Sequence, residues 1–129
     1  MILLDTNVVV NILRNDIRGQ NWVEYLKDKS VGLTSITTFE LYLGAESSKK
    51  REYNMNAIQK LFQQFPVFPF NVKASKIAAN IYHDLEKKGQ MIELNDIYIA
   101  SIVIEQNSIL ATDNTKHFDR ISTLKIITI

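Results

Sequence analysis

The chain contains no cysteine, only two prolines and four glycines, and no long apolar run. Without cysteine it forms neither a disulfide nor a thiolate metal site, so any metal ion must be held by oxygen ligands or by the two histidines, His83 and His117. No apolar stretch approaches the roughly 20 residues that cross a bilayer. The first residues also lack the basic region of a signal peptide. We therefore expect a cytoplasmic protein with no membrane partner.

The chain also lacks an excess of either charge, because 15 Lys and Arg residues face 14 Asp and Glu residues and leave a formal charge of +1. Such a balance predicts neither a nucleic-acid nor a membrane partner by itself. The length of 129 residues is enough for one domain with a substantial core and too short for two. We expect a single domain over residues 1–129.

Strand-like and helix-like segments alternate along the whole chain. The expected strands are residues 2–4, 31–34, 66–70, 108–112 and 124–129. The expected helices are residues 8–13, 18–29, 35–44, 54–65, 72–88, the apolar run 97–104 and a short piece within 115–122. Alternation of this kind predicts an α/β fold with a parallel sheet, right-handed crossovers and helices on both faces. Pro66 and Pro69 place the third strand at an edge of the sheet.

The apolar run 97–104 has no glycine or proline and predicts a helix that is buried on nearly all sides. Asn95 or Asp96 is a good N-cap for it, because its side-chain oxygen can accept from the free N–H groups of the first turn. This places the Asp96 carboxylate at the mouth of a buried helix.

Three further acids are predicted to lie near Asp96. Asp5 and Asp113 each follow a predicted buried strand, and Glu40 lies one turn into the helix after the second strand. In parallel sheets the ligand site lies beyond the carboxyl ends of the strands, where the strand order reverses. We therefore expect the four carboxylates to share one edge of the sheet.

Each acid also has an ordinary structural explanation. Asp5 and Asp96 can serve only as helix caps, Asp113 can belong to a turn with Asn114, and Thr37 with Glu40 has the spacing of a capping box. Four carboxylates close together favour a different reading, because like charges raise one another's pKa unless a cation is bound. Hard oxygen ligands point to Mg²⁺ or Mn²⁺, and such a site suits phosphodiester hydrolysis. A carboxylate that does not bind the metal can accept the proton of the attacking water.

Four stretches of the sequence resemble the motifs of the PIN-domain nucleases, in that family's order and rough spacing. They are Leu4-Asp5-Thr6-Asn7, Thr38-Phe39-Glu40-Leu41, the segment from Gly89 through Asp96 to Ala100, and the segment from Ala111 through Asp113 to His117-Phe118. The small size resembles the VapC toxins of type II toxin–antitoxin systems. The resemblance implies a three-layer α/β/α domain with a parallel sheet of about five strands.

The resemblance also implies an activity and partners. It implies an endoribonuclease that depends on Mg²⁺ or Mn²⁺, leaves a 5′-phosphate and is usually a homodimer. A VapB-like antitoxin would inhibit it by inserting a segment near the acidic site. Carried over to this sequence, Asp5, Glu40, Asp96 and Asp113 match the acidic quartet of catalytic and metal-binding residues.

Two more positions match polar residues beside the family's site. Thr112 is one of them. Asn7 is the other, and we expect it to fix the position of Asp5 or of a metal-bound water. The sequence departs from the family in two loops, where Ser122-Thr123 replaces a common Pro-Gly pair and Gln106-Asn107 replaces a usual glycine. These departures affect loop geometry and not the acidic quartet.

The basic residues and histidines are weaker candidates. Lys116 and Arg120 lie close to Asp113 in sequence and are candidates for contacts to RNA phosphates. The basic run at residues 49–51 is interpreted first as part of a solvent-exposed face. We expect His117 to be packed beside Phe118, and His83 to be structural or on the surface. Residues 18–29 and 42–51 suit either a dimer or antitoxin surface or ordinary core packing.

Three other functions compete with a VapC-type toxin. One is a PIN-type nuclease for RNA maturation without an antitoxin, and another is a PIN module that binds RNA or protein without cleaving. The third is a phosphotransfer domain, which is disfavoured because Asn7 stands where a phosphatase of that type needs a second aspartate. The sequence does not identify the RNA that is cut or the number of metal ions.

Overall fold

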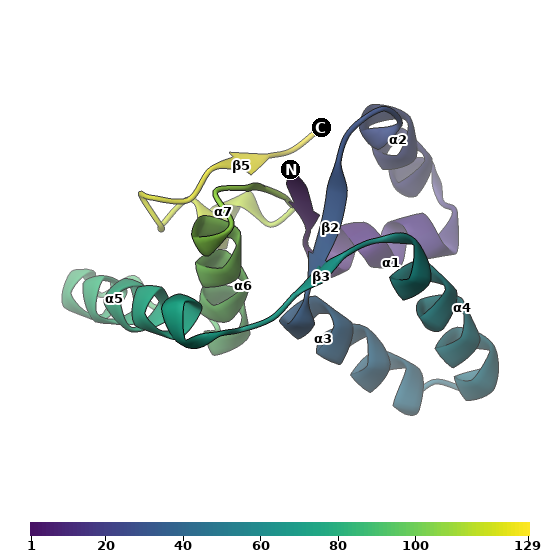
Figure 1. Ribbon diagram of the computed structural model, residues 1–129, viewed down its shortest axis with the longest axis horizontal. Coiled ribbons are helices and arrows are strands. Elements are labelled where there is room, and N and C mark those ends of the chain that lie inside the picture. Colours follow the sequence, from purple (N-terminus) through teal and green to yellow (C-terminus); the bar gives the residue numbers. More distant parts are fainter.

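The computed structural model describes residues 1–129 and contains a five-stranded sheet and seven helices. The strands are β1 (Ile2–Leu4), β2 (Val31–Thr34), β3 (Val67–Phe68), β4 (Ile109–Ala111) and β5 (Ile126–Ile127). The helices are α1 (Thr6–Arg14), α2 (Ile17–Leu26), α3 (Ser35–Glu46), α4 (Arg51–Gln64), α5 (Val72–Lys88), α6 (Leu94–Glu105) and α7 (Thr115–Phe118). Figure 1 shows α5 and α6 on one side of the strands, with α1, α2 and α4 on the other.

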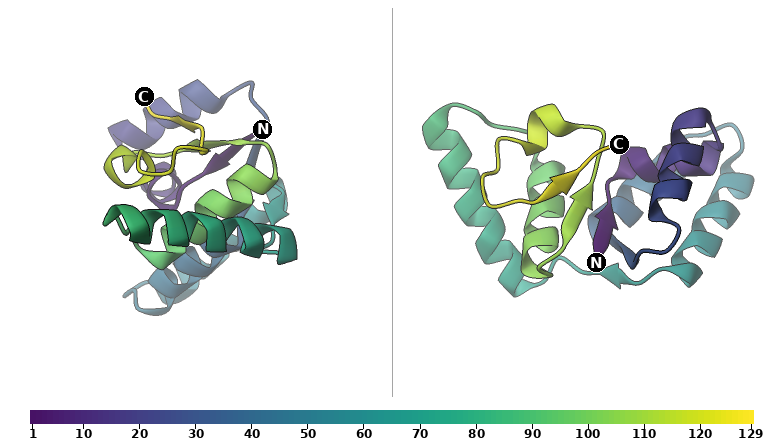
Figure 2. Two further views of the ribbon diagram at one scale, coloured as in Figure 1. Left: turned by 90° about the vertical axis from the view of Figure 1, so that its left-hand side faces the viewer. Right: turned by 90° about the horizontal axis from the view of Figure 1, so that it is seen from above.

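All strands are parallel, and their order in the sheet is β3-β2-β1-β4-β5. This confirms the predicted α/β fold with a five-stranded parallel sheet, and it confirms the edge position of the strand flanked by Pro66 and Pro69. Because β1 pairs with both β2 and β4, the chain leaves β1 in one direction along the sheet and later returns to its other side. The views in Figure 2 show the two termini and the central strands between the helical layers.

The central strands are buried on both faces. In β1, Leu3 packs into one hydrophobic cluster with α5 and α6, whereas its neighbours Ile2 and Leu4 pack into a second cluster with α1 to α4. In β4, Leu110 and Ala111 divide between the same two clusters. Successive side chains of a strand point to opposite faces, so an uninterrupted apolar run is what a strand between two helical layers requires.

The helix that carries Asp96 begins earlier than predicted. Its N-cap is Glu93, and Asp96 lies in the first turn with its N–H bonded to the Glu93 carbonyl at 3.1 Å. The prediction of Asn95 or Asp96 as the N-cap was therefore wrong. The side chain of Glu93 makes no capping hydrogen bond, and Leu94 is exposed, so neither residue has the local pattern that normally marks a helix start.

The ends of two other helices follow the expected chemistry. α5 ends at Gly89, which has a φ of 63°, after Lys87 and Lys88 in the last turn. α6 is followed by Asn107, whose φ of 50° also lies in the left-handed region. Asparagine tolerates that region better than most residues, so it can replace the glycine that is usual there. No helix of the structure has both the length and the apolar character to cross a membrane.

Candidate active site

The first two predicted residues meet where β1 and β4 lie side by side. Asp5 directly follows β1 and caps α1 by accepting a hydrogen bond from the Thr6 N–H at 2.8 Å. Its other carboxylate oxygen accepts from the Thr112 hydroxyl at 2.8 Å, and Thr112 directly follows β4. The strand order reverses at this pair of strands, which is where ligand sites form in open parallel sheets.

Burial disfavours the charged form of the Asp5 carboxylate. Asp5 is 5% exposed, and its burial raises the pKa of its carboxyl group above the ordinary value. The hydrogen bonds from Thr112 and Thr6 oppose that rise, whereas the nearby charges of Glu40 and Asp113 add to it. A bound cation would relieve this repulsion.

Glu40 is positioned by α3 and held from α1. The Thr6 hydroxyl donates to a Glu40 carboxylate oxygen at 2.7 Å, and this bond joins residues 34 apart in sequence. The capping-box reading of Thr37 and Glu40 was wrong, because α3 begins at Ser35 and its N-cap is Thr34, which accepts from the Thr37 N–H at 3.1 Å. The Glu40 carboxylate is therefore free of a capping role.

Asp96 carries the largest perturbation of the four acids. Its side chain is 15% exposed, and burial together with the charges of Asp5 and Glu40 raises the pKa of Asp96 to about 6. The Nδ1 atom of His117 lies 3.7 Å from an Asp96 oxygen and opposes the rise. His117 also lies 3.1 Å from the Asn114 side-chain amide. Its side chain is 37% exposed, so its predicted packing beside Phe118 was wrong, and it faces the acidic site.

Asp113 differs from the other three acids because it is paired within the chain. Arg18 donates from Nε and from a terminal nitrogen to the two carboxylate oxygens, and the Trp22 indole N–H donates to Oδ2 at 3.3 Å. The Arg18 hydrogen bonds, with smaller contributions from Trp22 and Thr128, hold the pKa of the Asp113 carboxyl below its usual range. Asp113 is thus ionised and already paired with a cation.

The donor set suits a hard divalent cation, although no three acidic or histidine side chains stand close enough together to enclose a metal ion. Mg²⁺ commonly binds through one or two carboxylates, several waters and substrate phosphates instead of a complete protein cage. Asp5 and Asp96 are two carboxylates that repel each other and whose pKa values are raised. Glu40 lies near enough to influence both. These three residues fit such an ion.

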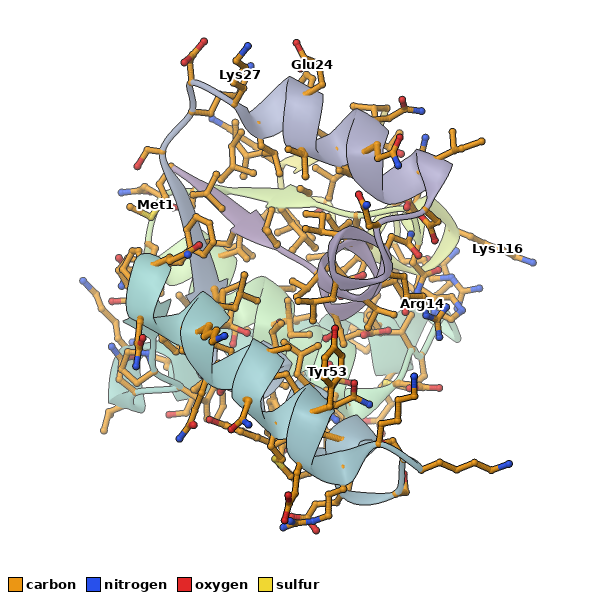
Figure 3. The ribbon with its side chains drawn as sticks, turned by 90° about the vertical axis from the view of Figure 1, so that its right-hand side faces the viewer. Met1, Arg14, Glu24, Lys27, Tyr53 and Lys116 are labelled. Atoms are coloured by element: carbon orange, nitrogen blue, oxygen red, sulfur yellow. The ribbon has the colours of Figure 1, made fainter.

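The remaining predicted residues lie around this centre. Asn7 is exposed at the start of α1, and it is its neighbour Thr6 that bonds an acid of the site. Lys116 is exposed and extends away from the body of the protein in Figure 3. Arg120 donates to the backbone carbonyls of Gln90 and Met91, in the loop before α6. His83 is exposed on α5, as expected of a surface residue.

Sequence reasoning missed Arg18 and Thr6 as partners of the acids. Arg18 lies 95 residues from Asp113 and Thr6 lies 34 residues from Glu40, so no local spacing links the members of either pair. Thr6 stands next to Asp5, and that adjacency was the only available signal. Within residues 18–29, the core-packing alternative holds for Trp22 and Leu26, which are buried, whereas Val23 and Tyr25 remain exposed.

A groove opens beside the acidic centre, between α1, α3 and α4. Its volume is about 350 Å³, and its lining includes Thr6, Glu40, Tyr53 of α4 and Arg14 of α1. Tyr53 is 73% exposed, and Figure 3 shows Tyr53 and Arg14 on the same side of the molecule. The groove thus connects an exposed aromatic surface with the Glu40 carboxylate.

Comparison with known proteins agrees with this architecture. The sequence profile of the PIN domain matches residues 2–124, which is nearly the whole chain. The chain therefore belongs to the PIN-domain family.

Within that family, its relatives carry the name ribonuclease VapC. The chain is 32% identical to ribonuclease VapC2 of Rickettsia felis, over 95% of this chain and 92% of the relative. It is 30% identical to ribonuclease VapC2 of Haemophilus influenzae, over 95% and 93% of the two chains. It is also similar to a chain in the crystal structure of VapBC2 from Rickettsia felis bound to a DNA fragment from their promoter, with a TM-score of 0.90, 32% identity and coverage of 100% and 99%.

Proposed function

We propose that this protein is an endoribonuclease that depends on Mg²⁺ or Mn²⁺ and acts as the VapC-type toxin of a toxin–antitoxin pair. The observation that carries the proposal is the cluster of Asp5, Glu40 and Asp96 at the strand-order reversal of a PIN fold, where burial and then neighbouring negative charge raise the pKa values of Asp5 and Asp96. Relatives at 30% identity or more over nearly the full chain are named as ribonucleases, which supports RNA as the substrate.

Each acid has a distinct role in the proposed reaction. Asp5 and Asp96 would hold the ion, and the Thr112 hydroxyl fixes the orientation of the Asp5 carboxylate. A divalent ion at this place supplies charge stabilisation for the phosphate and acidifies a water molecule. Glu40, held by Thr6, would be a further ligand or would accept the proton of the attacking water. In-line attack of water on the phosphorus leaves a 5′-phosphate and a 3′-hydroxyl.

The remaining polar residues support RNA binding in this proposal. Lys116 and Arg120 supply positive charge close to Asp113 in the chain and contact backbone phosphates without reading sequence. Asn7, exposed at the first turn of α1, orients a water of the metal. Because Arg120 already bonds the Gln90 and Met91 carbonyls, its contact with RNA would also order the loop before α6.

Two protein partners follow from the same proposal. A VapB-like antitoxin would occupy the groove between α1, α3 and α4, since Thr6 and Glu40 of the acidic site are part of its lining. A second copy of the chain would cover the apolar depression between α5 and α6, which is lined by Phe70, Tyr82, Leu94 and Tyr98. Tyr82 and Leu94 are 43% and 48% exposed in the single chain, which favours a homodimer there.

Cleavage of total RNA tests the enzymatic part of the proposal. The purified protein is incubated with RNA and Mg²⁺ or Mn²⁺, with and without EDTA, beside Asp96→Asn. A matched control is Asp84→Asn, which removes an exposed acid whose partner is Lys88 on α5. We expect cleavage by the wild type and the control, with loss in EDTA and in Asp96→Asn, and fragments that carry 5′-phosphates.

Other outcomes would contradict this function. Equal cleavage by Asp96→Asn and the wild type would trace the activity to a contaminant. Absence of cleavage by both, with Mn²⁺ present, would favour a PIN module that binds without cutting. The maturation-nuclease alternative predicts cleavage but no antitoxin gene beside the gene for this protein, whereas a toxin requires one.

A further inference from the structure

Both oxygens of the Asp113 carboxylate are occupied by groups of the same chain. Arg18 of α2 donates to both oxygens, the Trp22 indole N–H donates to Oδ2, and the Thr128 hydroxyl lies 3.4 Å from Oδ1. The Arg18 guanidinium also lies 5.7 Å from the centre of the Trp22 ring. A two-pronged guanidinium–carboxylate pair is among the stronger hydrogen-bonded contacts in proteins.

The helix that supplies these donors is fixed by close packing. Gly19 approaches α1 so tightly that a Cβ at this position would lie 2.0 Å from the Asn11 carbonyl oxygen. The Asp16 carboxylate caps α2 by accepting from the Gly19 N–H at 2.7 Å. Trp22 itself is fully buried. Arg18 and Trp22 therefore reach Asp113 from a rigid support.

Direct binding of a metal by Asp113 would break this arrangement. The carboxylate would have to leave Arg18, and the buried Trp22 indole N–H would lose its only acceptor. Proteins rarely leave buried donors without a partner. The other three acids are not opposed in this way, because no arginine or lysine pairs with Asp5, Glu40 or Asp96.

We propose that Arg18 and Trp22 hold Asp113 outside the coordination sphere of the metal ion, so that its one or two protein ligands come from Asp5, Glu40 and Asp96. In this arrangement Asp113 is a positioning residue that ties α2 and the C-terminal segment to the end of β4. The inference rests on the proposed metal-dependent function and departs from a four-carboxylate site.

Metal affinity measured by calorimetry distinguishes a site in which Asp113 binds the metal from one in which it does not, and it needs no activity assay. Mn²⁺ is titrated into the wild type, Asp113→Asn and Asp96→Asn. Asparagine keeps a side-chain oxygen that can accept from Trp22. We expect Asp113→Asn to raise the Kd by only about tenfold, because it removes no ligand but leaves the Arg18 cation unpaired near the metal. Asp96→Asn should raise the Kd by at least about 100-fold, because a charged ligand is lost.

Release of Asp113 provides a converse test. Arg18→Gln removes a cation and frees the carboxylate, so the Mn²⁺ Kd should fall by about tenfold. Addition of Asp113→Asn to Arg18→Gln should return the Kd to within about threefold of the wild type. The matched control is Arg51→Gln, which breaks an exposed arginine–carboxylate pair with Glu46 and should leave the Kd unchanged.

Trp22 is the only tryptophan of the chain, so its emission reports on this cluster without any substitution. Saturation of the wild type with Mg²⁺, verified by calorimetry, should leave the emission unchanged, whereas Arg18→Gln should respond. A Mg²⁺-dependent change in the wild type, or a loss of affinity in Asp113→Asn equal to that in Asp96→Asn, would overturn the inference alone. Absence of metal binding by the wild type would overturn both the inference and the proposed function.

Discussion

Replacement of Asp96 by asparagine should stabilise the metal-free protein. The folded state raises the pKa of this carboxyl from 3.8 to about 6, first through burial and then through the charges of Asp5 and Glu40. Below pH 3.8 the group is protonated in both states and adds no penalty. Between pH 3.8 and 6 the unfolded chain ionises while the folded chain keeps its proton, so stability falls as pH rises and stays lower above pH 6. The shift corresponds to about 3 kcal/mol at neutral pH.

Urea unfolding in EDTA measures this effect. Asp96→Asn should increase the free energy of unfolding by about 3 kcal/mol at pH 7.5 and by about half of that at pH 5. The control Asp84→Asn breaks an exposed pair with Lys88 and should lower stability by about 0.5 kcal/mol or less.

Metal should remove most of the stability difference between the two proteins. At a free Mn²⁺ concentration of about 100 times Kd, the wild type gains about 2.7 kcal/mol by mass action, whereas Asp96→Asn gains little. The reasoning would be refuted if Asp96→Asn were less stable than the wild type at pH 7.5 in EDTA, because Asp96 would then be a favourable structural contact and not a strained carboxylate.

Two further expectations concern single contacts. Thr6→Val removes the hydroxyl that holds Glu40, so RNA cleavage should fall by about tenfold while thermal unfolding shows a folded protein; unchanged cleavage would mean that Glu40 is positioned by other contacts. Gly19→Ala places a methyl group against the Asn11 carbonyl and should lower the free energy of unfolding by about 3 kcal/mol or more. Gly44→Ala, with nothing within 4 Å of the added carbon, should raise it by about 0.5–1 kcal/mol as a helix-interior substitution, and similar effects at both glycines would contradict the packing argument.

The order and type of most elements could be predicted because they depend on local chemistry. The uninterrupted apolar residues of β1 and β4 identify strands that are buried on both faces. Gly89 after Lys87 and Lys88 marks the end of α5. Asp5 directly follows β1 and Asp113 comes just after Thr112 at the end of β4, so their positions at one edge of the sheet also follow from the sequence.

What could not be predicted depends on contacts between distant parts of the chain. The start of α6 was predicted too far along the sequence because Asn95 and Asp96 are good capping residues. The observed cap, Glu93, makes no side-chain capping bond. The pairing of Arg18 with Asp113 depends on how α2 crosses α1, and a single sequence contains no record of that crossing. The four acids therefore looked equivalent in the sequence, although one of them is already neutralised.

The shortness of the two edge strands limits how this protein can associate with others. β3 and β5 contain two residues each, so neither edge of the sheet offers a long row of free backbone N–H and C=O groups. Addition of a strand from another chain needs such a row, and its absence also protects against edge-to-edge aggregation. The proposed antitoxin and second subunit would therefore be recognised through side chains on helical surfaces. Specificity for a partner can then change by substitutions on α3, α4 and α5 while the sheet that carries the acids stays the same.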